Sequence, residues 1–132
     1  MDTSNPGSSD LGEGFKSHFD ILPALDDTTR SQVYAVRHEV YCEDLHYEPV
    51  RPNRRESDEY NRHSVHCLMR TTDDTRTLVG CTRLVLARPE DPYYPFPFEV
   101  ACRANLPRHA VDSRKLPRDR ITEVSRLAVR HM

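Results

Sequence analysis

Apolar residues early in the chain recur at the spacing of a helix. Val33, Val36 and Val40 fall on one side of a helix predicted over 28–45, which is therefore expected to bury that side. A shorter apolar run before it ends at Pro23 and predicts a strand. The Asp and Thr residues between the two segments can cap the start of the helix. This part of the chain thus predicts a strand followed by an amphipathic helix.

The middle and the end of the chain have the composition of strands. Residues 63–71 and 75–87 are rich in side chains that pack on a pleated surface, and the turn-forming TDDT between them predicts an antiparallel hairpin. The segment 121–129 alternates weakly and predicts a further strand. Two proline-containing stretches, 46–62 and 88–98, show neither the helical nor the strand period of apolar residues and therefore predict loops. The first is long enough to contain a helical turn.

Composition sets the limits of the folded unit. Residues 1–14 are mainly small or polar and have almost nothing to bury, so we expect a disordered tail there and one domain from 15 to 132. Charged residues make up 30% of the chain, with a net charge of −2, which gives no general attraction for nucleic acid. A local exception is the basic stretch 103–120, which predicts either a solvated linker or a docking segment for an acidic partner.

The cysteines and the hydropathy favour a cytoplasmic location. The cysteines lack the C-x-x-C spacing, and we expect them to pack as small apolar side chains rather than form disulfides: Cys42, Cys67, Cys81 and Cys102. The sequence contains no basic-then-apolar leader and no apolar run of about twenty residues. We therefore expect neither export nor stable membrane insertion.

Three potential metal ligands lie on the polar side of the predicted helix. His38, Cys42 and His46 recur at every fourth position, which could bring them to one metal ion. No fourth ligand is near them in the sequence, and a solvated polar face explains them as well. We predict the solvated face and no metal site.

A group of charged residues is harder to explain by solvation. Glu56, Asp58 and Asn61 form the spacing E-x-D-x-x-N directly after the basic RPNRR, which could balance the acids in a solvated loop. Arg83, however, lies inside the apolar run VGCTRLVL and needs a partner, which is either a loop acid or Glu123.

For two further arginines, Arg126 and Arg37, the sequence also allows either a surface position or a place in a shared charged site. Glu123 and Arg126 would face opposite sides of a regular strand, so both can serve one site only if the strand has a β-bulge. Arg37 lies at the edge of the predicted helix, where it pairs with a neighbouring acid on the surface or joins the same site.

Five segments, taken in their order and spacing, resemble one protein family. They are RHEVY (37–41), Tyr47, ESDEYNRHS (56–64), LVGCTRL (78–84) and EVSRLAV (123–129). The set resembles the autoinducer-synthase-like branch of the GNAT acyltransferases, which includes acyl-homoserine-lactone synthases and N-acyl amino acid synthases. The segments VYCEDL and SVHCLMR are most similar to the acyltransferases associated with exosortase and PEP-CTERM systems.

The resemblance implies a mixed α/β (α+β) fold of the GNAT type. The predicted elements would be its first strand, first helix, a long active-site loop, the second and third strands, another loop and the fourth strand. A GNAT domain continues past the fourth strand. The resemblance therefore implies that residues 15–132 are the N-terminal half of such a domain, truncated after strand 4, with little activity and marginal stability of its own.

The resemblance also implies a reaction. In this family an amine attacks the thioester carbonyl of a fatty acyl group carried by acyl carrier protein or coenzyme A, which is a co-substrate and not a bound cofactor. We therefore expect an N-acyltransferase whose acceptor is an amine such as an amino acid. The alternative is a non-catalytic binding module, a degenerate half-domain that docks an acidic carrier protein.

Residue roles carry over with the motifs. The implied catalytic residues are Glu56, Asp58, Arg83, Glu123 and Arg126, with Glu56 or Asp58 as the base. The implied substrate-binding residues are Arg37, Tyr41, Tyr47, Asn61, Ser125 and Leu127. A bulge between Ser125 and Ala128 would supply a backbone N–H for the oxyanion. Asn61 replaces a third acid of the homoserine-lactone synthases and Tyr47 replaces a frequent Trp, which disfavours S-adenosylmethionine as acceptor and favours another amine.

Overall fold

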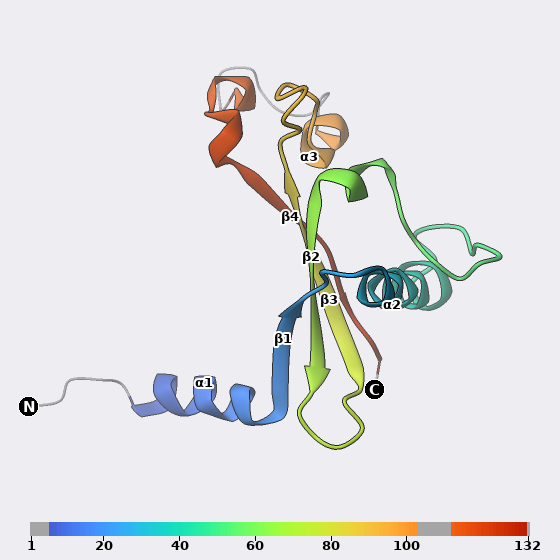
Figure 1. The fold of residues 1–132 in the computed structure, drawn as a ribbon, viewed down its shortest axis with the longest axis vertical. Coiled ribbons are helices and arrows are strands. Elements are labelled where there is room, and N and C mark those ends of the chain that lie inside the picture. The colour runs from blue at the N-terminus through green and yellow to red at the C-terminus, as the bar shows by residue number, and fades with distance from the viewer. Residues whose placement is uncertain (1–5, 103–111, 132) are drawn as a thin grey trace, which may run out of the picture.

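Four antiparallel strands form one sheet in the order β1-β2-β3-β4 (Figure 1). They span Phe19–Pro23, Ser64–Thr71, Leu78–Leu86 and Thr122–Val129. The computed structural model describes residues 6–102 and 112–131. The predicted strands, the antiparallel β2–β3 hairpin and the mixed α/β class are confirmed.

Helix α2 (Asp27–Arg37) lies across one face of this sheet (Figure 1). It begins as predicted: the Asp26 carboxylate accepts a hydrogen bond from the Thr29 N–H at 2.7 Å. The apolar side of the helix and the facing strands form the main core, which contains Val33, Val36, Val40, Leu68, Cys81 and Ala128. Among the described residues, no helix packs across the opposite face of the sheet.

The helix continues into a π-helical segment, η1 (His38–Asp44). His38 and Cys42 lie in this segment and are buried rather than solvated. The predicted solvated face is therefore wrong for these two residues. His38 Nε2 accepts a hydrogen bond from the Arg51 backbone N–H at 2.9 Å. Within residues 6–102 and 112–131, no group of three or more His, Cys, Asp or Glu side chains is placed to hold a metal ion.

Strand β4 contains the β-bulge that a shared site requires. In its pairing with β3, Ser125 lies opposite Arg83, whereas Ala128 lies opposite Cys81, so β4 has one residue more than β3 in this interval. Arg126 lies in the bulge with a left-handed φ of 52°. The bulge falls in the predicted segment, and it turns the Ser125 and Arg126 side chains toward the same side of the sheet, the side of α2.

The later part of the chain adds a small lobe at one end of the sheet (Figure 1). It contains α3 (Pro97–Ala101), η3 (Ser113–Lys115) and η4 (Arg118–Arg120). Arg118 is buried and contacts both oxygens of the Glu99 carboxylate, with Nη2 to Oε1 at 2.8 Å. The prediction of a solvated linker over 103–120 is therefore wrong at Arg118, because this guanidinium joins the two halves of the lobe. Residues 103–111 of that stretch lie outside the described part.

Helix α1 (Pro6–His18) precedes β1 and extends away from the sheet (Figure 1). The structure differs here from the disordered tail expected over 1–14, of which residues 1–5 lie outside the described part. Basic side chains in the last turn complement the helix dipole, and the rings of Phe15 and Phe19, with centroids 5.2 Å apart, join the helix to β1. Neither α1 nor any other described helix is long and apolar enough to cross a membrane.

Candidate active site

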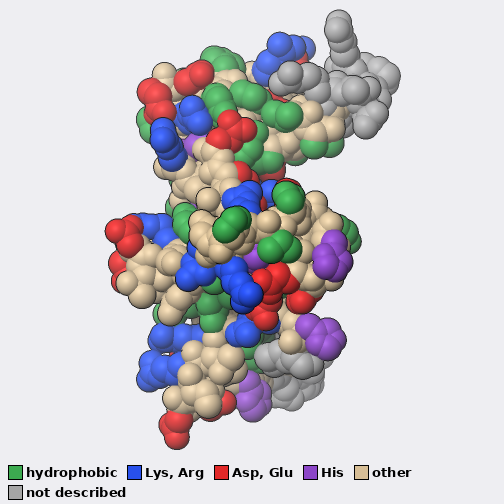
Figure 2. All heavy atoms as spheres, turned by 90° about the vertical axis from the view of Figure 1, so that its right-hand side faces the viewer, with side chains coloured by type: hydrophobic (Ala, Val, Ile, Leu, Met, Phe, Trp, Pro, Cys, Tyr) green, Lys and Arg blue, Asp and Glu red, His purple; other side chains and the backbone are tan. Residues whose placement is uncertain are grey.

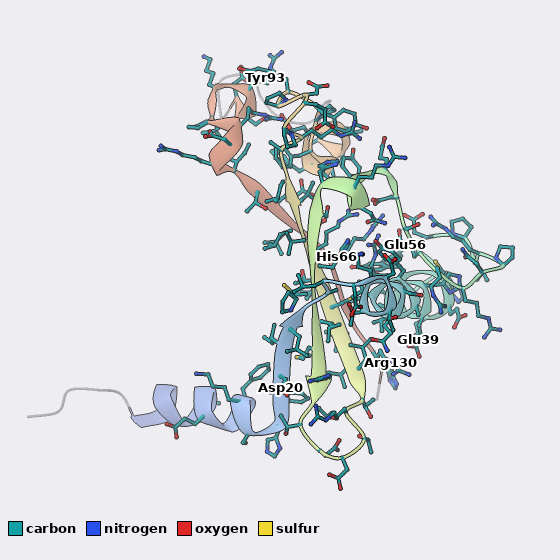
Figure 3. All side chains as sticks on the ribbon, viewed as in Figure 1. Asp20, Glu39, Glu56, His66, Tyr93 and Arg130 are labelled. Atoms are coloured by element: carbon teal, nitrogen blue, oxygen red, sulfur yellow. The ribbon has the colours of Figure 1, made fainter. Side chains whose placement is uncertain are left out.

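The loop that follows η1 folds back onto η1 and α2, with one contact to each. The Arg51 N–H donates to His38, and the Glu56 N–H donates to the Tyr34 carbonyl oxygen at 3.0 Å. The second contact holds Glu56 against α2, where the residue is 1% exposed (Figure 3). The first loop acid therefore lies in the protein interior and not in a solvated loop.

Arg37, the last residue of α2, is the partner of this buried acid. Its Nε donates to Glu56 Oε2 at 2.5 Å, and its Nη2 lies at the same distance from that oxygen. Both side chains are buried, so each charge depends on the other for compensation. The pair fixes the loop on the end of the helix and excludes the surface alternative for Arg37.

Arg83 reaches the same place from the sheet. Its Nη1 donates to Asp58 Oδ1 at 2.6 Å, and its Nε donates to Ser125 Oγ at 3.0 Å. The amide oxygen of Asn61 accepts from Arg37 Nη1 at 3.1 Å and from Arg83 Nη1 at 3.2 Å. The predicted pairing of Arg83 with a loop acid is confirmed, and Asn61 links the two arginines.

The ion pair with Arg83 keeps the Asp58 carboxyl ionised. Burial alone would raise the pKa of Asp58, but the hydrogen bond and the positive charge of Arg83 outweigh it and hold that pKa below its ordinary value of 3.8. Asp58 is therefore ionised at neutral pH and a weak base.

Arg126 completes the group from the bulge of β4. Its Nη2 lies 3.4 Å from Glu56 Oε1 and 3.6 Å from Asp58 Oδ2. Its guanidinium lies over the ring of Tyr41, at 5.4 Å, and the Tyr41 hydroxyl donates to the Leu127 carbonyl oxygen. We call the following residues the acid–arginine cluster: Arg37, Glu56, Asp58, Asn61, Arg83 and Arg126.

Three residues predicted for the site lie at its margin or outside it. Glu123 precedes Ser125 by two positions on β4, and its Oε1 accepts a hydrogen bond from the Phe98 N–H at 2.8 Å. Burial raises the pKa of Glu123 above its ordinary value of 4.5. Tyr47 is largely exposed, and Leu127 is largely exposed but contributes its carbonyl oxygen. Ser125 and Tyr41 contact the cluster directly.

His66 is a buried neighbour of the cluster that the sequence does not reveal. It lies opposite Arg83 in the β2–β3 pairing and is 1% exposed. Within the described part of the chain neither of its ring nitrogens has a hydrogen-bond partner, and its ring meets that of Tyr34 edge to face, with centroids 5.4 Å apart. Burial, together with the charges of Arg37 and Arg83, lowers the pKa of His66 from 6.5 to about 4. An H-x-x-H motif on a predicted strand gives no signal of such burial.

Replacing His66 by phenylalanine is expected to remove a pH dependence of stability. Below pH 6.5 the unfolded chain binds a proton at this histidine that the folded protein does not bind until about pH 4, so folding weakens as the pH falls through that interval and no further below it. A shift of this size corresponds to roughly 3 kcal/mol. Urea unfolding at about pH 7 and about pH 4.5 measures it. An equal loss of stability in both proteins would contradict the assignment.

An apolar hollow lies on the other face of the sheet, next to the bulge. Its lining includes Ile21, Cys67, Met69, Gly80, Leu127 and Val129. Gly80 keeps β3 and β4 close, because a Cβ there would lie 2.9 Å from the Ala128 carbonyl oxygen. Leu127 contributes to the hollow and to the cluster side of the sheet. The residue lines the hollow, and its carbonyl oxygen accepts a hydrogen bond from the Tyr41 hydroxyl on the α2 side.

The fold and the site are consistent with a domain of the acyltransferase class. Their common features are an antiparallel sheet, a helix-and-loop layer on one face, and a bulged β4 beside paired charges. The sequence model of a family described as acetyltransferase (GNAT) domain matches residues 36–132, and the chain belongs to this family. Acyl transfer is the general activity of GNAT domains. No curated protein and no solved structure matches the chain significantly.

Proposed function

We propose that the protein is an N-acyltransferase of the autoinducer-synthase-like branch. It would transfer a fatty acyl group from a thioester of acyl carrier protein or coenzyme A to an amine. The observation that carries this proposal is the acid–arginine cluster, in which the E-x-D-x-x-N loop, the end of α2 and the sheet converge beside the bulge of β4. Charged side chains held in place before the substrate arrives are what orientation of a cationic acceptor requires.

The two loop acids are suited to bind the acceptor and Glu123 is suited to act as base. Asp58 is engaged by Arg83, and its lowered pKa makes it a poor proton acceptor. Glu56 is engaged by Arg37 through Oε2. Glu123 lies two residues before Ser125, on the same face of β4 and within reach of the charge of Arg83, and burial raises its pKa, which favours proton uptake. We therefore assign the base to Glu123 rather than to a loop acid.

The loop acids, Glu123 and the backbone N–H groups at the bulge are enough to account for each step of the proposed reaction. The acceptor's ammonium, attracted by the loop acids, gives a proton to Glu123, directly or through a water. The free amine attacks the thioester carbonyl carbon, so a C–N bond forms and the carbonyl oxygen becomes an oxyanion. Backbone N–H groups at the bulge of β4 would stabilise that oxyanion. The C–S bond breaks as the carbonyl re-forms, and the leaving thiolate takes the proton that Glu123 holds. Glu123 then accepts the second amine proton and releases it to water.

The apolar hollow supports a fatty rather than a small acyl group. It lies on the sheet face opposite the cluster, and the two meet at the bulge near Leu127. The thioester carbonyl at the bulge would thus have an amine on one side and apolar surface on the other. An alkyl chain gains about 0.8 kcal/mol for each buried methylene, so such a surface favours long donors.

Mass spectrometry of acyl amides tests this function. The protein is incubated with a long-chain acyl–carrier protein or acyl–coenzyme A and a mixture of amino acids, and free thiol and new amides are measured. We expect both products, at a low rate, from the wild type and at the same rate from Arg130→Gln, which removes an ion pair with Glu39 away from the cluster (Figure 3). At low acceptor concentration we expect much less of both from Asp58→Asn, because this variant should bind the acceptor more weakly. Carrier-protein binding without any amide product would instead support the binding-module alternative.

A further inference from the structure

Arg126 is held differently from the other arginines of the cluster. Arg37 and Arg83 make hydrogen bonds of 2.5 and 2.6 Å to their acids. Arg126 makes none within the cluster: its Nη2 lies between three carboxylates, at 3.4 Å from Glu56, 3.5 Å from Glu48 and 3.6 Å from Asp58. The Arg126 guanidinium is therefore a cation that lies close to three carboxylates without a hydrogen bond to any of them.

Among the described residues, three buried atoms of the acid–arginine cluster have no hydrogen-bond partner. They are Glu56 Oε1, on a residue that is 1% exposed, Arg126 Nε, and Arg37 Nη2, which still lies close to Glu56 Oε2. A buried carboxylate oxygen without a donor lacks roughly 1–3 kcal/mol of compensation. An ammonium group carries three N–H donors on one atom and could satisfy Glu56 Oε1 and Asp58 Oδ2 together, which the flat guanidinium does not do here.

We propose that Arg126 occupies the position of the acceptor's ammonium, that an entering ammonium displaces it, and that the displaced guanidinium then binds the acceptor's carboxylate. The acceptor would accordingly be a zwitterionic α-amino acid and not a simple amine. This inference rests on the proposed function, because it concerns the acceptor side of the same site. It gives Arg126 the role of a specificity-determining residue.

The contacts of Arg126 favour a zwitterion. Three guanidiniums (Arg37, Arg83, Arg126) face the carboxylates of Glu48, Glu56 and Asp58, and Glu123, the residue assigned as the base, supplies a further carboxylate. A simple amine that displaced Arg126 would take from this guanidinium its contacts with Glu56 and Asp58 and give it no anion in return. The carboxylate of a zwitterion offers Arg126 the bidentate partner that it lacks. Arg126 is also the outermost arginine of the cluster, with a side chain 26% exposed, and so has room to move.

Ligand titrations followed by NMR, without an acyl donor, test this inference. The ligands are glycine, glycinamide, which keeps the ammonium but has no carboxylate, and N-acetylglycine, which keeps only the carboxylate. For the wild type we expect glycine to bind about tenfold or more tightly than glycinamide, and N-acetylglycine to bind weakly. In Arg126→Gln the site gains a net negative charge and loses the competing cation. We expect glycinamide to bind more tightly than to the wild type, and about as tightly as glycine.

The matched control is Arg130→Gln, which removes the same charge from the end of β4 but leaves the cluster intact. It should keep the wild-type preference for glycine. An unchanged preference in Arg126→Gln, an equal loss of both ligands, or no binding of glycine to the wild type at millimolar concentration would overturn the inference. Arg126→Lys should retain part of the preference because it keeps a cation.

The outcomes separate this inference from the proposed function. Glycine binding that depends on Arg126, without acyl transfer in the amide assay, would retain the amino acid site and reject the transferase. Acyl transfer to glycinamide as efficiently as to glycine would retain the transferase and reject the role of Arg126.

Discussion

Replacing Arg37 by methionine is expected to lower the free energy of unfolding by about 3–5 kcal/mol, a large part of the stability of a small domain. The change leaves the Glu56 carboxylate buried with only the loose contact to Arg126, and Asn61 loses one of its two donors. The methionine side chain fills much of the same volume, so the loss reports the missing charge rather than a cavity. Urea unfolding at neutral pH measures the effect.

Two companion variants make this result specific. In Arg37→Met with Glu56→Leu both buried charges are removed, and most of the stability should return. Arg130→Gln removes an arginine from a partly exposed ion pair with Glu39 and should change the unfolding free energy by less than about 1 kcal/mol. If Arg37→Met were as stable as Arg130→Gln, the buried pair would not be what fixes the active-site loop on α2.

Replacing Glu123 by glutamine is expected to lower kcat by about 10²–10⁴-fold with little change in KM for the acceptor. Glutamine keeps the hydrogen bond to the Phe98 N–H but cannot take up a proton, so the fold should be unaffected. In the wild type, the rate should rise with pH through the raised pKa of Glu123, and this limb of the pH profile should be absent in the variant. Steady-state thiol release with a fixed acyl thioester gives both quantities.

Asp58→Asn provides the comparison. This residue is assigned to attraction of the ammonium and not to proton transfer, so the variant should raise KM for the acceptor and retain the pH limb. A lost pH limb in Asp58→Asn and a normal one in Glu123→Gln would return the base to the loop, as the sequence first suggests.

The pairing in this site can be predicted from the sequence because one charged residue occupies a position that the hydrophobic pattern predicts to be buried. Arg83 lies in an apolar run, and a charge there requires a partner, which limits the choice to a few acids. Glu123 and Arg126 can likewise serve one site only if the strand has a bulge, and a bulge is present in β4. These inferences hold because they follow from period-two alternation, which depends little on tertiary context.

Other features depend on contacts that no local pattern records. His38 and Cys42 in η1 are buried, and the loop residue Arg51 binds His38, although an α-helical projection places both residues on a polar face. Arg118 is buried because a segment distant in sequence supplies Glu99. In a basic, proline-containing stretch, composition alone cannot distinguish such an arginine from its solvated neighbours.

The additional residue in β4 has a consequence for how this strand can vary. Upstream of it, odd-numbered side chains point toward α2, whereas Ala128, downstream, belongs to the core on that same side. Deleting one residue from this interval would restore simple alternation and exchange the two surfaces of one half of the strand. An insertion or deletion here would thus move the site residues of β4 to a different face from its core residues, although no amino acid had been replaced. The length of this segment is therefore as restrictive as the identity of its residues.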